Sequence, residues 1–328
     1  MQPAVLTQDI TKRFGDLTAV NKINLSINDR EIFGLIGPNG AGKTTLVRML
    51  TTVIPPTDGT AIISGFDIRQ DPDGVRRNIG VVAQASTLDV ELTAWENMNI
   101  YAKYYDVPAE TRKERIKELL DVVGLADRAN FTVGSYSGGM KRRLELVRSL
   151  IHRPRVLFLD EPTTGLDPQA RSAVLDYLRE LHKGHDITIV LTTHYLEEAE
   201  SLCDRLAVVD FGKVVALGTS TELKRNATGG DVVEADVVPL PYQALEALKA
   251  SKFALDVKKH ANTITVLVQS GAEAVPRIVE LVDANGGKVR SITLRAPTLD
   301  DVFLHYTGRS IREDTNITNK RFVSNWGR

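Results

Sequence analysis

Short apolar runs alternate with amphipathic helical segments along the chain up to about residue 225. The runs have the length and β-branched content of buried strands, and most are separated by segments of helical periodicity. Strand-like segments occur at 4–14, 23–27, 31–37, 59–68, 79–84, 155–162, 187–194 and 205–218. Residues 93–150 carry a helical pattern almost throughout. We therefore expect an α/β core that contains a helical insertion.

A different order of elements follows residue 225. The stretch NATGGD at 226–231 has the composition of a linker. Beyond it the pattern predicts strand, helix, two strands, helix and strand, and then a short helix at 299–307. The order βαββαβ is that of a ferredoxin-like α+β domain. The predicted division is a first domain at 1–225 with a helical subdomain at about 88–150, a second domain at 226–308 and a polar tail at 309–328.

Composition limits the classes of partner. The 328 residues are 42% hydrophobic and 25% charged, with a formal net charge of −1, so nothing favours nucleic acid as an obligatory partner. The single cysteine, Cys203, excludes a disulfide within the chain and is expected in the core. We find neither a signal-peptide pattern nor an apolar stretch of membrane-spanning length. If the protein works at a membrane, another chain must supply the membrane part.

A glycine-rich loop joins the strand-like segment 31–37 to a helix. GPNGAGKT at 37–44 fits the pattern G-x-x-x-x-G-K-[ST], in which backbone N–H groups wrap phosphates. Lys43 would reach the β- and γ-phosphates, and the hydroxyl of Thr44 would ligate Mg²⁺. Taken alone, the pattern also fits a glycine-rich turn; its place between strand and helix favours a nucleotide site. The predicted nucleotide-binding residues here are Gly37, Pro38, Asn39, Gly40, Ala41, Gly42, Lys43, Thr44 and Thr45.

A second element supports the phosphate assignment. VLFLDE at 156–161 is an apolar strand that ends in two carboxylates. In P-loop enzymes such an aspartate, here Asp160, holds Mg²⁺. Glu161 would then lie near the γ-phosphate and polarise the attacking water. A buried strand that ends in surface acids explains this motif alone, but not its occurrence together with the loop at 37–44.

SYSGGMKRR at 135–143 predicts another anion site. Ser137, Gly138 and Gly139 precede a helical pattern whose apolar face includes Leu144 and Val147. Free N–H groups and the helix dipole favour an anion at such an end, and glycine allows close approach to the backbone. The chain thus has two predicted phosphate sites but only one set of residues for hydrolysis.

Together these motifs resemble the nucleotide-binding subunit of an ATP-binding-cassette (ABC) transporter, over roughly residues 4–225. The likeness rests on the loop GPNGAGKT, the strand LFLDE, the YSGGM signature at 136–140, Gln84 at the end of IGVVAQ, the loop Gly165-Leu166-Asp167, His194 in TTHYLEEAE and Phe14 in KRFG. It implies a P-loop NTPase cassette made of an α/β core, an antiparallel β subdomain and a helical subdomain.

The resemblance implies a role for each matched residue. Phe14 stacks on adenine, Gln84 joins Thr44 and Asp160 around Mg²⁺, and Glu161 and His194 are catalytic. Ser137, Gly138 and Gly139, with Asp167, bind an ATP that is held by the P-loop of a second cassette. One chain is then half of a dimer, with itself or with a similar subunit, and the second phosphate site serves the neighbour.

Two positions depart from the commonest family pattern. Phe14 replaces the Tyr that is usual at this position and keeps an aromatic ring for stacking. Met140 replaces the Gln that is usual at the end of the signature, while the Ser-Gly-Gly part is intact. Because Glu161 and His194 are both present, we expect a hydrolysing site rather than a degenerate one.

The detailed sequence is similar to the daunorubicin/doxorubicin-resistance group of exporters. SGFDIRQDPDGVRRNIGVVAQ, LTAWENMNIYAKYYDVP and LRAPTLDDVFLHYTGR carry this likeness. It implies a separate ABC-2-type permease as partner, a place on the cytoplasmic face of the membrane, and a drug, antibiotic or lipid-like cargo. The alternative is a soluble, non-transport ABC ATPase that acts on a macromolecular complex; such proteins usually carry tandem cassettes, coiled coils or zinc modules, which this sequence lacks.

Other features that could suggest a binding site are interpreted as ordinary surface or packing residues. The run KRR at 141–143 is expected to be exposed charge at the start of a helix rather than a nucleic-acid patch. His152, His182, His185, His260 and His305 lack metal-ligand spacing and are expected to be structural or solvated. For Trp95, Tyr101, Tyr104 and Tyr105, internal packing and contact with the membrane subunit both stay open.

Overall fold

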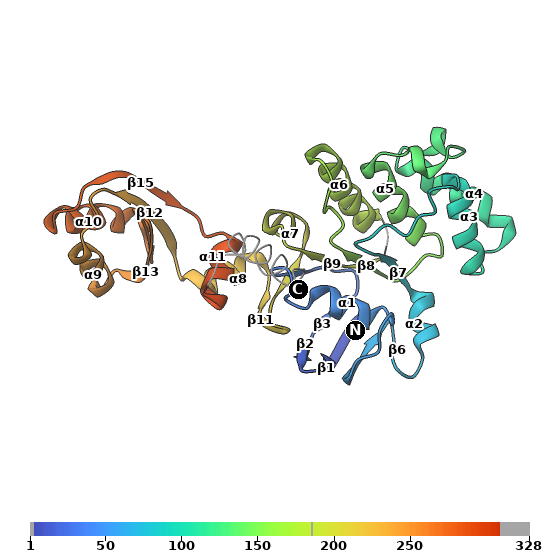
Figure 1. Ribbon diagram of the computed structural model, residues 1–328, viewed down its shortest axis with the longest axis horizontal. Coiled ribbons are helices and arrows are strands. Elements are labelled where there is room, and N and C mark those ends of the chain that lie inside the picture. Colours follow the sequence, from blue (N-terminus) through green and yellow to red (C-terminus); the bar gives the residue numbers. More distant parts are fainter. Residues whose placement is uncertain (1–2, 185, 309–328) are drawn as a thin grey trace, which may run out of the picture. The chain divides into compact units, whose positions relative to one another are not determined.

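The computed structural model describes residues 3–184 and 186–308, and the chain divides into two compact units between Leu217 and Gly218. The predicted tail at 309–328 and His185 lie outside the described residues. Each unit is described by itself below, with the element labels of Figure 1.

A six-stranded sheet forms the centre of the first unit, in the order β11-β10-β4-β9-β8-β7. Its strands are β4 (Ile32–Ile36), β7 (Ile79–Val82), β8 (Val156–Asp160), β9 (Thr188–Thr193), β10 (Arg205–Asp210) and β11 (Lys213–Gly218). The pairs from β10 to β7 are parallel, and every residue of β4, β8 and β9 is buried. Such strands are covered on both faces, as the apolar sequence runs predict.

The two faces of the sheet carry separate cores. Along β8, Leu157 and Leu159 pack against the helices α3 to α6, whereas Val156 and Phe158 pack on the side of α1 and the antiparallel sheet. This alternation follows from the period-two geometry of a strand. Figure 1 shows α5 and α6 on one side of β7–β9 and α1 on the other.

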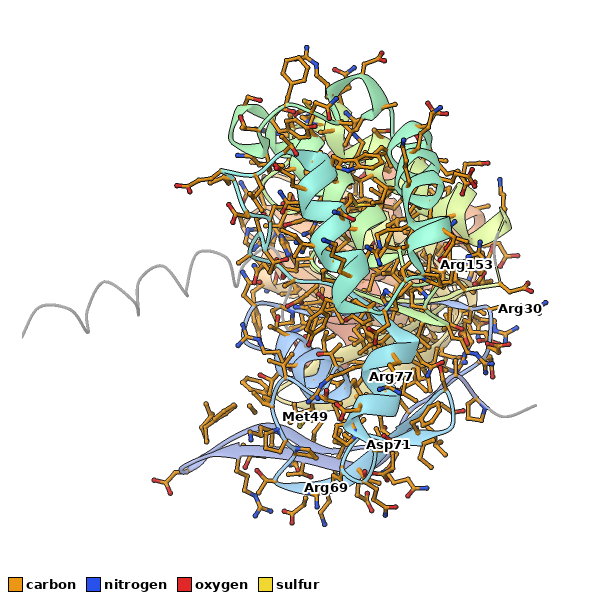
Figure 2. The ribbon with its side chains drawn as sticks, turned by 90° about the vertical axis from the view of Figure 1, so that its right-hand side faces the viewer. Arg30, Met49, Arg69, Asp71, Arg77 and Arg153 are labelled. Carbon is orange, nitrogen blue, oxygen red and sulfur yellow. The ribbon has the colours of Figure 1, made fainter. Side chains whose placement is uncertain are left out.

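An antiparallel sheet lies beside α1 (Lys43–Leu50) and contains β1 (Val5–Phe14), β2 (Leu17–Ile23), β3 (Ser26–Ile27), β5 (Asp58–Ile63) and β6 (Phe66–Asp67). The prediction of one strand at 23–27 was wrong, because β2 begins at Leu17 and pairs with β1 through an irregular register. Helix α2 (Pro72–Asn78) follows; Asp71, labelled in Figure 2, caps it by accepting from Gly74 N at 2.8 Å.

The helical insertion is confirmed. It contains α3 (Ala94–Tyr104), α4 (Ala109–Val122), the 3₁₀ turns η1 (Ala126–Arg128) and η2 (Val133–Ser135), and α5 (Gly138–Ser149). A capping box between Thr93 and Glu96 starts α3. Helices α6 (Pro168–Gly184) and α7 (Leu196–Leu202) complete the unit.

The second unit has the predicted βαββαβ order. Its elements are α8 (Ser220–Thr228), β12 (Asp231–Val237), α9 (Tyr242–Ala250), β13 (Ala254–His260), β14 (Thr263–Val268), α10 (Gly271–Ala284), β15 (Val289–Arg295) and α11 (Leu299–Thr307). The sheet order β13-β14-β12-β15, with antiparallel pairs, is the ferredoxin-like topology. Residues 226–228, predicted as linker, instead end α8, which begins with a capping box between Thr219 and Glu222.

No helix within residues 3–184 and 186–308 has both the length and the apolar character needed to cross a bilayer.

Candidate functional site

The loop after β4 forms a cradle that excludes side chains at two glycines. Gly37 has φ of 155° and Gly42 has φ of 103°. A Cβ at Gly37 would lie 2.2 Å from the carbonyl oxygen of Val209, and one at Gly42 would lie 2.3 Å from that of Ala19. The loop therefore needs glycine for close backbone contact as well as for conformation. It leads into α1, whose N-terminal N–H groups favour an anion.

Lys43 lies over this loop. Its Nζ donates to the carbonyl oxygens of Gly37 at 2.7 Å and Pro38 at 2.9 Å, and the side chain is buried. Burial lowers the pKa of Lys43, while the negative charges of Glu161 and Asp160 act in the opposite direction. A buried ammonium at the N-terminus of a helix suits an oligophosphate, which supplies the negative charge that the ammonium needs.

The side chains of Thr44 and Asp160 meet across the edge of the sheet. Thr44 Oγ1 lies 3.1 Å from Asp160 Oδ1, and Thr192 Oγ1 donates to the same oxygen at 2.7 Å. The sequence did not single out Thr192, because a threonine at a strand end carries no distinctive signal. One hydroxyl and one carboxylate are oxygen donors that fit Mg²⁺, which takes its remaining ligands from water and substrate phosphates.

Glu161 is held in an unusual conformation at the end of β8. Its φ of 47° lies in the left-handed region, where a non-glycine residue stores strain of the kind found at functional sites. Its N–H donates to Thr192 Oγ1 at 2.9 Å, and Thr164 Oγ1 donates to its Oε2 at 3.0 Å. These bonds fix both the backbone and the carboxylate. The contribution of Thr164 was missed at the sequence level.

Two further predicted residues converge on the Glu161 carboxylate. Gln84 Nε2 donates to Oε2 at 3.2 Å, and His194 Nδ1 lies 3.3 Å from Oε1. The hydrogen bond with His194 is the largest cause that holds the pKa of Glu161 below its ordinary value, although burial opposes it. The side chain is thus an ionised, oriented acceptor. Gln84 contacts Glu161 here, and no contact joins it to Thr44 or Asp160.

These residues come from the carboxyl ends of four neighbouring parallel strands. The P-loop follows β4, Gln84 follows β7, Asp160 ends β8 with Glu161 next to it, and His194 follows β9. This edge is where open parallel sheets bind ligands. The site can hold a phosphate chain, bring a cation to it, and place a carboxylate beside the terminal phosphate.

The signature residues lie at the N-terminus of α5. Ser137 is the cap and its Oγ accepts from Met140 N at 3.3 Å, while Ser137 and Gly138 are exposed. Gly139 is buried, and a Cβ there would lie 2.8 Å from Cβ of Ala170 on α6. No contact joins Ser137, Gly138 or Gly139 to the P-loop of the same chain, so the structure does not assemble the two predicted phosphate sites into one.

The interpretation of KRR at 141–143 as exposed charge was wrong for Arg142. That side chain is buried and donates to carbonyl oxygens of Pro162 and Ala83. Arg143 bonds to the carbonyl oxygen of Val123 at 2.6 Å. The sequence does not distinguish a buried arginine at this helical position from an exposed one, because the carbonyl groups that bond to it lie in loops distant in sequence.

Phe14 and Asp167 are placed apart from the carboxylate cluster. Phe14 ends β1 and is half exposed, with Lys12 Nζ 5.3 Å from its ring centre. It belongs to the β1–β2 hairpin whose Ala19 approaches Gly42. Asp167 Oδ1 accepts from Ala170 N at 2.9 Å and so begins α6. Neither residue contacts Lys43 or Glu161 in this chain.

Several aromatic residues of the helical insertion pack internally. Tyr105 stacks on His152 with ring centres 3.9 Å apart and lies 4.9 Å from Tyr101. Tyr104, in contrast, is 76% exposed. His152 is confirmed as structural, since its Nε2 contacts the carbonyl oxygen of Ile79 at 2.9 Å. Trp95 packs against the helical core, and so does Cys203, whose thiol pKa is raised by burial.

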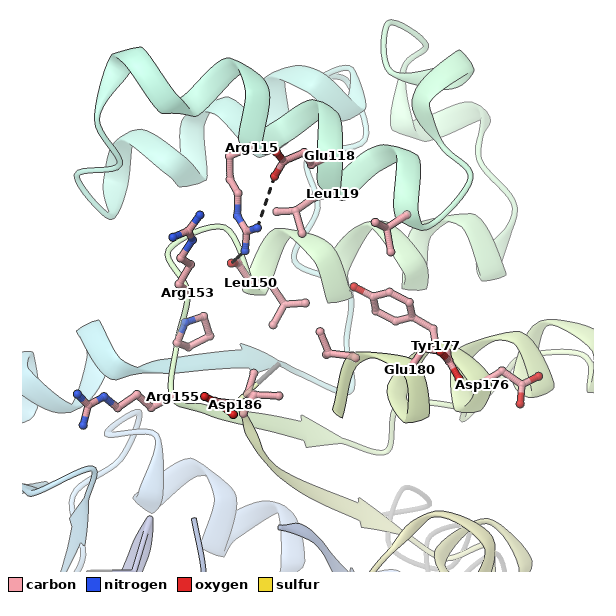
Figure 3. A pocket seen from close by; sticks show the side chains of 14 residues that line it. Arg115, Glu118, Leu119, Leu150, Arg153, Arg155, Asp176, Tyr177, Glu180 and Asp186 are labelled. Carbon is pink, nitrogen blue, oxygen red and sulfur yellow. Dashed lines mark hydrogen bonds and ion pairs between the residues drawn. The ribbon is translucent and has the colours of Figure 1, made fainter. Parts of the chain in front are cut away.

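A cavity of about 900 Å³ lies between α4, the loop after α5, and α6 (Figure 3). Arg115, Leu119, Arg153 and Tyr177 are among its lining residues, and Arg115 lies 3.7 Å from Glu118. The loop at its wall precedes β8, so the cavity lies by the amino end of that strand. It contains none of the predicted site residues.

Comparisons with known proteins agree with this geometry. The family described as "ABC transporter" matches residues 20–164, and the family described as "ATP-binding protein DrrA1-3-like, C-terminal domain" matches residues 218–307. The chain is 42% identical to the daunorubicin resistance ATP-binding protein DrrA3 of Streptomyces coeruleorubidus, over 94% of this chain and 98% of that protein. It is 40% identical to the Nod factor export ATP-binding protein I of Ralstonia nicotianae, over 95% and 96% of the two chains.

Solved structures with the same fold are cassettes. An ATP-binding subunit of an ABC transporter superposes with a TM-score of 0.62 at 28% identity, covering 68% of this chain and 92% of that one. The cassette MJ0796, solved as a dimer in a post-hydrolysis state with ADP and Pi, has a TM-score of 0.60 at 28% identity and covers 66% and 98%. These matches confirm the predicted α/β cassette fold.

Proposed function

This chain belongs to the family of ATP-binding subunits of ABC transporters. On that premise we propose how its residues bind and hydrolyse ATP and how hydrolysis is coupled to a membrane partner. The chain is an ATPase subunit of an exporter, of the drug-resistance type. Relatives that match over almost its whole length are export and resistance proteins, so the soluble, non-transport alternative is not retained. The convergence of Gln84 and His194 on Glu161 carries the mechanistic proposal.

The P-loop and α1 hold the phosphates of the nucleotide. The backbone N–H groups of residues 37–45 wrap the phosphate chain, and Lys43 turns its ammonium from the loop carbonyls to the β- and γ-phosphates. Phe14 offers its exposed ring as a stacking surface for the base. The glycines at 37 and 42 support this assignment, because a side chain at either would collide with the backbone beside the loop.

Thr44 and Asp160 are the protein groups that would hold Mg²⁺. Their oxygens are already 3.1 Å apart, and Thr192 orients the carboxylate. The cation would neutralise charge on the β- and γ-phosphates. Gln84 would complete the surroundings through its amide oxygen, since its Nε2 is engaged by Glu161.

Glu161 accepts a hydrogen bond from the attacking water and polarises it. Its lowered pKa keeps the carboxylate ionised, and Thr164 and His194 fix its direction. His194 and Lys43 face the charge that develops on the phosphoryl oxygens. Catalysis of this kind is mainly positioning and electrostatic stabilisation.

The exposed signature end of α5 would bind the ATP held by another cassette. Ser137, Gly138 and Gly139 lie at a helix N-terminus and make no contact with their own P-loop. A second cassette placed head to tail would give each nucleotide one P-loop and one signature helix, with Asp167 at the interface. The dimer with ADP and Pi among the solved structures is consistent with a working pair of cassettes.

A separate ABC-2-type permease would complete the exporter and hold the chain at the cytoplasmic face of the membrane. Tyr104, exposed on the helical subdomain, is a candidate contact, whereas Tyr101 and Tyr105 are engaged in internal packing. The cargo would be a drug, antibiotic or lipid-like molecule that the permease selects.

Affinity purification tests this assembly. The tagged chain is purified from detergent-solubilised membranes of its native host, and co-purifying proteins are identified by mass spectrometry. Recovery of a polytopic membrane protein in comparable amount supports the exporter. Recovery of only ribosomal or DNA-repair proteins from the soluble fraction would overturn the permease partnership and leave the ATPase assignment intact.

A further inference from the structure

One stripe of α5 carries three buried charged side chains that hold a distant loop. Arg142, Glu145 and Arg148 are three residues apart along the helix and are at most 9% exposed. All three bond to the segment 83–87, which contains Gln84. Charged residues this deeply buried are uncommon unless they are paired and hydrogen-bonded.

Arg142 joins two loops of the catalytic edge. Its Nη1 donates to the carbonyl oxygen of Ala83 at 2.8 Å, next to Gln84 in the chain. Its Nε donates to the carbonyl oxygen of Pro162 at 2.7 Å, next to Glu161. Its Nη2 also reaches the carbonyl oxygen of Glu161 at 3.4 Å. The planar guanidinium therefore spans the backbone on both sides of the Gln84–Glu161 contact.

Glu145 and Arg148 hold the far end of the segment. Glu145 Oε1 accepts from Thr87 N at 3.1 Å, while its Oε2 lies 2.9 Å from Arg142 Nη1. Arg148 Nη1 donates to the carbonyl oxygen of Thr87 at 2.9 Å, and Nη2 donates to the Thr87 hydroxyl. Arg148 also lies over the ring of Tyr101, 4.8 Å from its centre. Gln84 thus lies between Ala83 and Thr87, and both of these residues are bonded to side chains of α5.

The same helix presents Ser137 and Gly138 at its exposed N-terminus, within two turns of Arg142. A helix moves as a rigid rod over this length, so a displacement at its N-terminus is carried to the carbonyl groups that Arg142 holds. The pair Arg142–Glu145 is 8% and 5% exposed. Apolar residues of similar size often stabilise as well as such a pair, so stability alone does not explain the charges.

We propose that Arg142, Glu145 and Arg148 are positioning residues that set the distance between Gln84 and Glu161 according to the position of α5. Phosphate bound at the signature end by a neighbouring cassette is thereby sensed at this chain's own hydrolytic site. The inference rests on the proposed function, because it needs the signature end to bind the neighbour's ATP. It assigns a role to three residues that the sequence did not predict as site residues.

The test compares Arg142→Met with Arg143→Met in the full-length chain. Arg143 is the matched control, since it bonds to Val123 on the other side of α5 and touches neither loop. For Arg142→Met we expect kcat to fall about 10- to 100-fold, as for a misplaced catalytic group, with ATP affinity at the P-loop within about 3-fold of wild type. The Hill coefficient for ATP should fall towards that of independent sites. Arg143→Met should keep kcat and the Hill coefficient.

A double variant separates positioning from stability. Arg142→Met alone leaves Glu145 as an unpaired buried charge and will lower the melting temperature; Arg142→Met/Glu145→Met removes both charges and should restore it. If kcat stays low in the double variant, the bonds that Arg142 and Glu145 make to Ala83, Pro162 and Thr87 matter for catalysis, as proposed. If kcat recovers with the melting temperature, the residues are structural and the inference is wrong.

Arg142→Lys is a third variant, which should have an intermediate effect on kcat. One ammonium cannot span both carbonyl groups, so we expect kcat between those of wild type and Arg142→Met, at unchanged ATP affinity. Equal kcat for Arg142→Met and Arg143→Met would also overturn the inference while leaving the ATPase assignment intact. Failure of the wild-type chain to hydrolyse ATP would instead overturn the proposed residue roles.

Discussion

Nε2 of Gln84 lies 3.2 Å from Oε2 of Glu161, although 77 positions separate the two residues in the chain. The parallel neighbours β7 and β8 bring them together, because each residue follows the carboxyl end of its strand. The contact joins the residue proposed to polarise water to a loop that α5 holds from the other side. Hydrolysis and the position of the signature helix are therefore linked within a single cassette.

Replacing Glu161 with Gln should abolish turnover and spare binding. The amide keeps the size and the polar contacts of the side chain but lacks the negative charge that polarises water. We expect kcat to fall about 10²- to 10⁴-fold with ATP affinity nearly unchanged. Steady-state phosphate release and equilibrium nucleotide binding measure the two effects. Glu180→Gln, an exposed acid on α6, is the control, and undiminished hydrolysis by Glu161→Gln would refute the catalytic role.

Replacing His194 with Ala should move the acid limb of the pH–rate profile to higher pH. The hydrogen bond from His194 is the largest cause of the lowered pKa of Glu161, so its loss should raise that pKa towards the ordinary value, although Thr164 and Lys43 still lower it. A lowered folded-state pKa keeps the carboxylate ionised, with its stabilising contribution, until the pH falls through that value. The wild type should therefore retain relative activity at acidic pH where His194→Ala has lost it.

Profiles of kcat from about pH 4 to 8, each normalised to its own maximum, make this comparison. His260→Ala, an exposed histidine on β13, should leave the acid limb unchanged. Superimposable acid limbs for wild type and His194→Ala would show that this hydrogen bond does not tune Glu161.

The sequence predicted which residues meet at this edge of the sheet, because strand ends are visible in it. Apolar runs end at Gly37, Gln84, Asp160 and His194, and parallel strands bring their carboxyl ends to one edge. The residues that fix these groups were missed. Thr192 bonds to the carboxylate of Asp160 and the N–H of Glu161, and Arg142 bonds to carbonyl groups of distant loops. Local periodicity carries no information about partners so far away in sequence.

Among the elements that the sequence did not predict, β2 and α8 were missed for different reasons. The irregular pairing of β1 with β2 breaks the alternation that marks a strand, so Leu17–Ile23 was not recognised. Helix α8 is short and mostly polar, and its buried apolar side chains are only Leu223 and Ala227. Its capping box, Thr219 followed by Glu222, was a readable signal for a helix in place of the predicted linker.

Replacing Thr44 with Ala should raise the Mg²⁺ concentration needed for half-maximal hydrolysis. The hydroxyl lies 3.1 Å from Asp160 Oδ1 and is one of two protein oxygens proposed to hold the cation. Loss even of an outer-shell partner typically weakens a metal site about 10- to 100-fold, so we expect at least this shift from loss of a ligand. Titration of ATPase activity with Mg²⁺ at saturating ATP measures the shift. Thr111→Ala, an exposed threonine on α4, is the control; an unshifted Mg²⁺ curve for Thr44→Ala would remove it from the metal site.

Mixing two inactive variants tests whether two copies of this chain share each ATP. Lys43→Ala should lose hydrolysis because the buried ammonium of the P-loop is missing, and Ser137→Ala should lose it because the signature end is impaired. In a mixed dimer, the P-loop of the Ser137→Ala chain faces the intact signature of the Lys43→Ala chain. One of the two sites is then complete, while the other lacks both groups.

Random pairing of equal amounts should therefore restore about a quarter of the wild-type rate, since half of the dimers are mixed and each has one intact site. Steady-state phosphate release before and after mixing measures the recovery. The control mixes Lys43→Ala with Lys43→Ala/Ser137→Ala, in which every P-loop lacks its lysine and no recovery is expected. If the first mixture also fails to exceed the sum of its parents, two copies of this chain do not form the composite site. The signature end of α5 would then serve a different cassette.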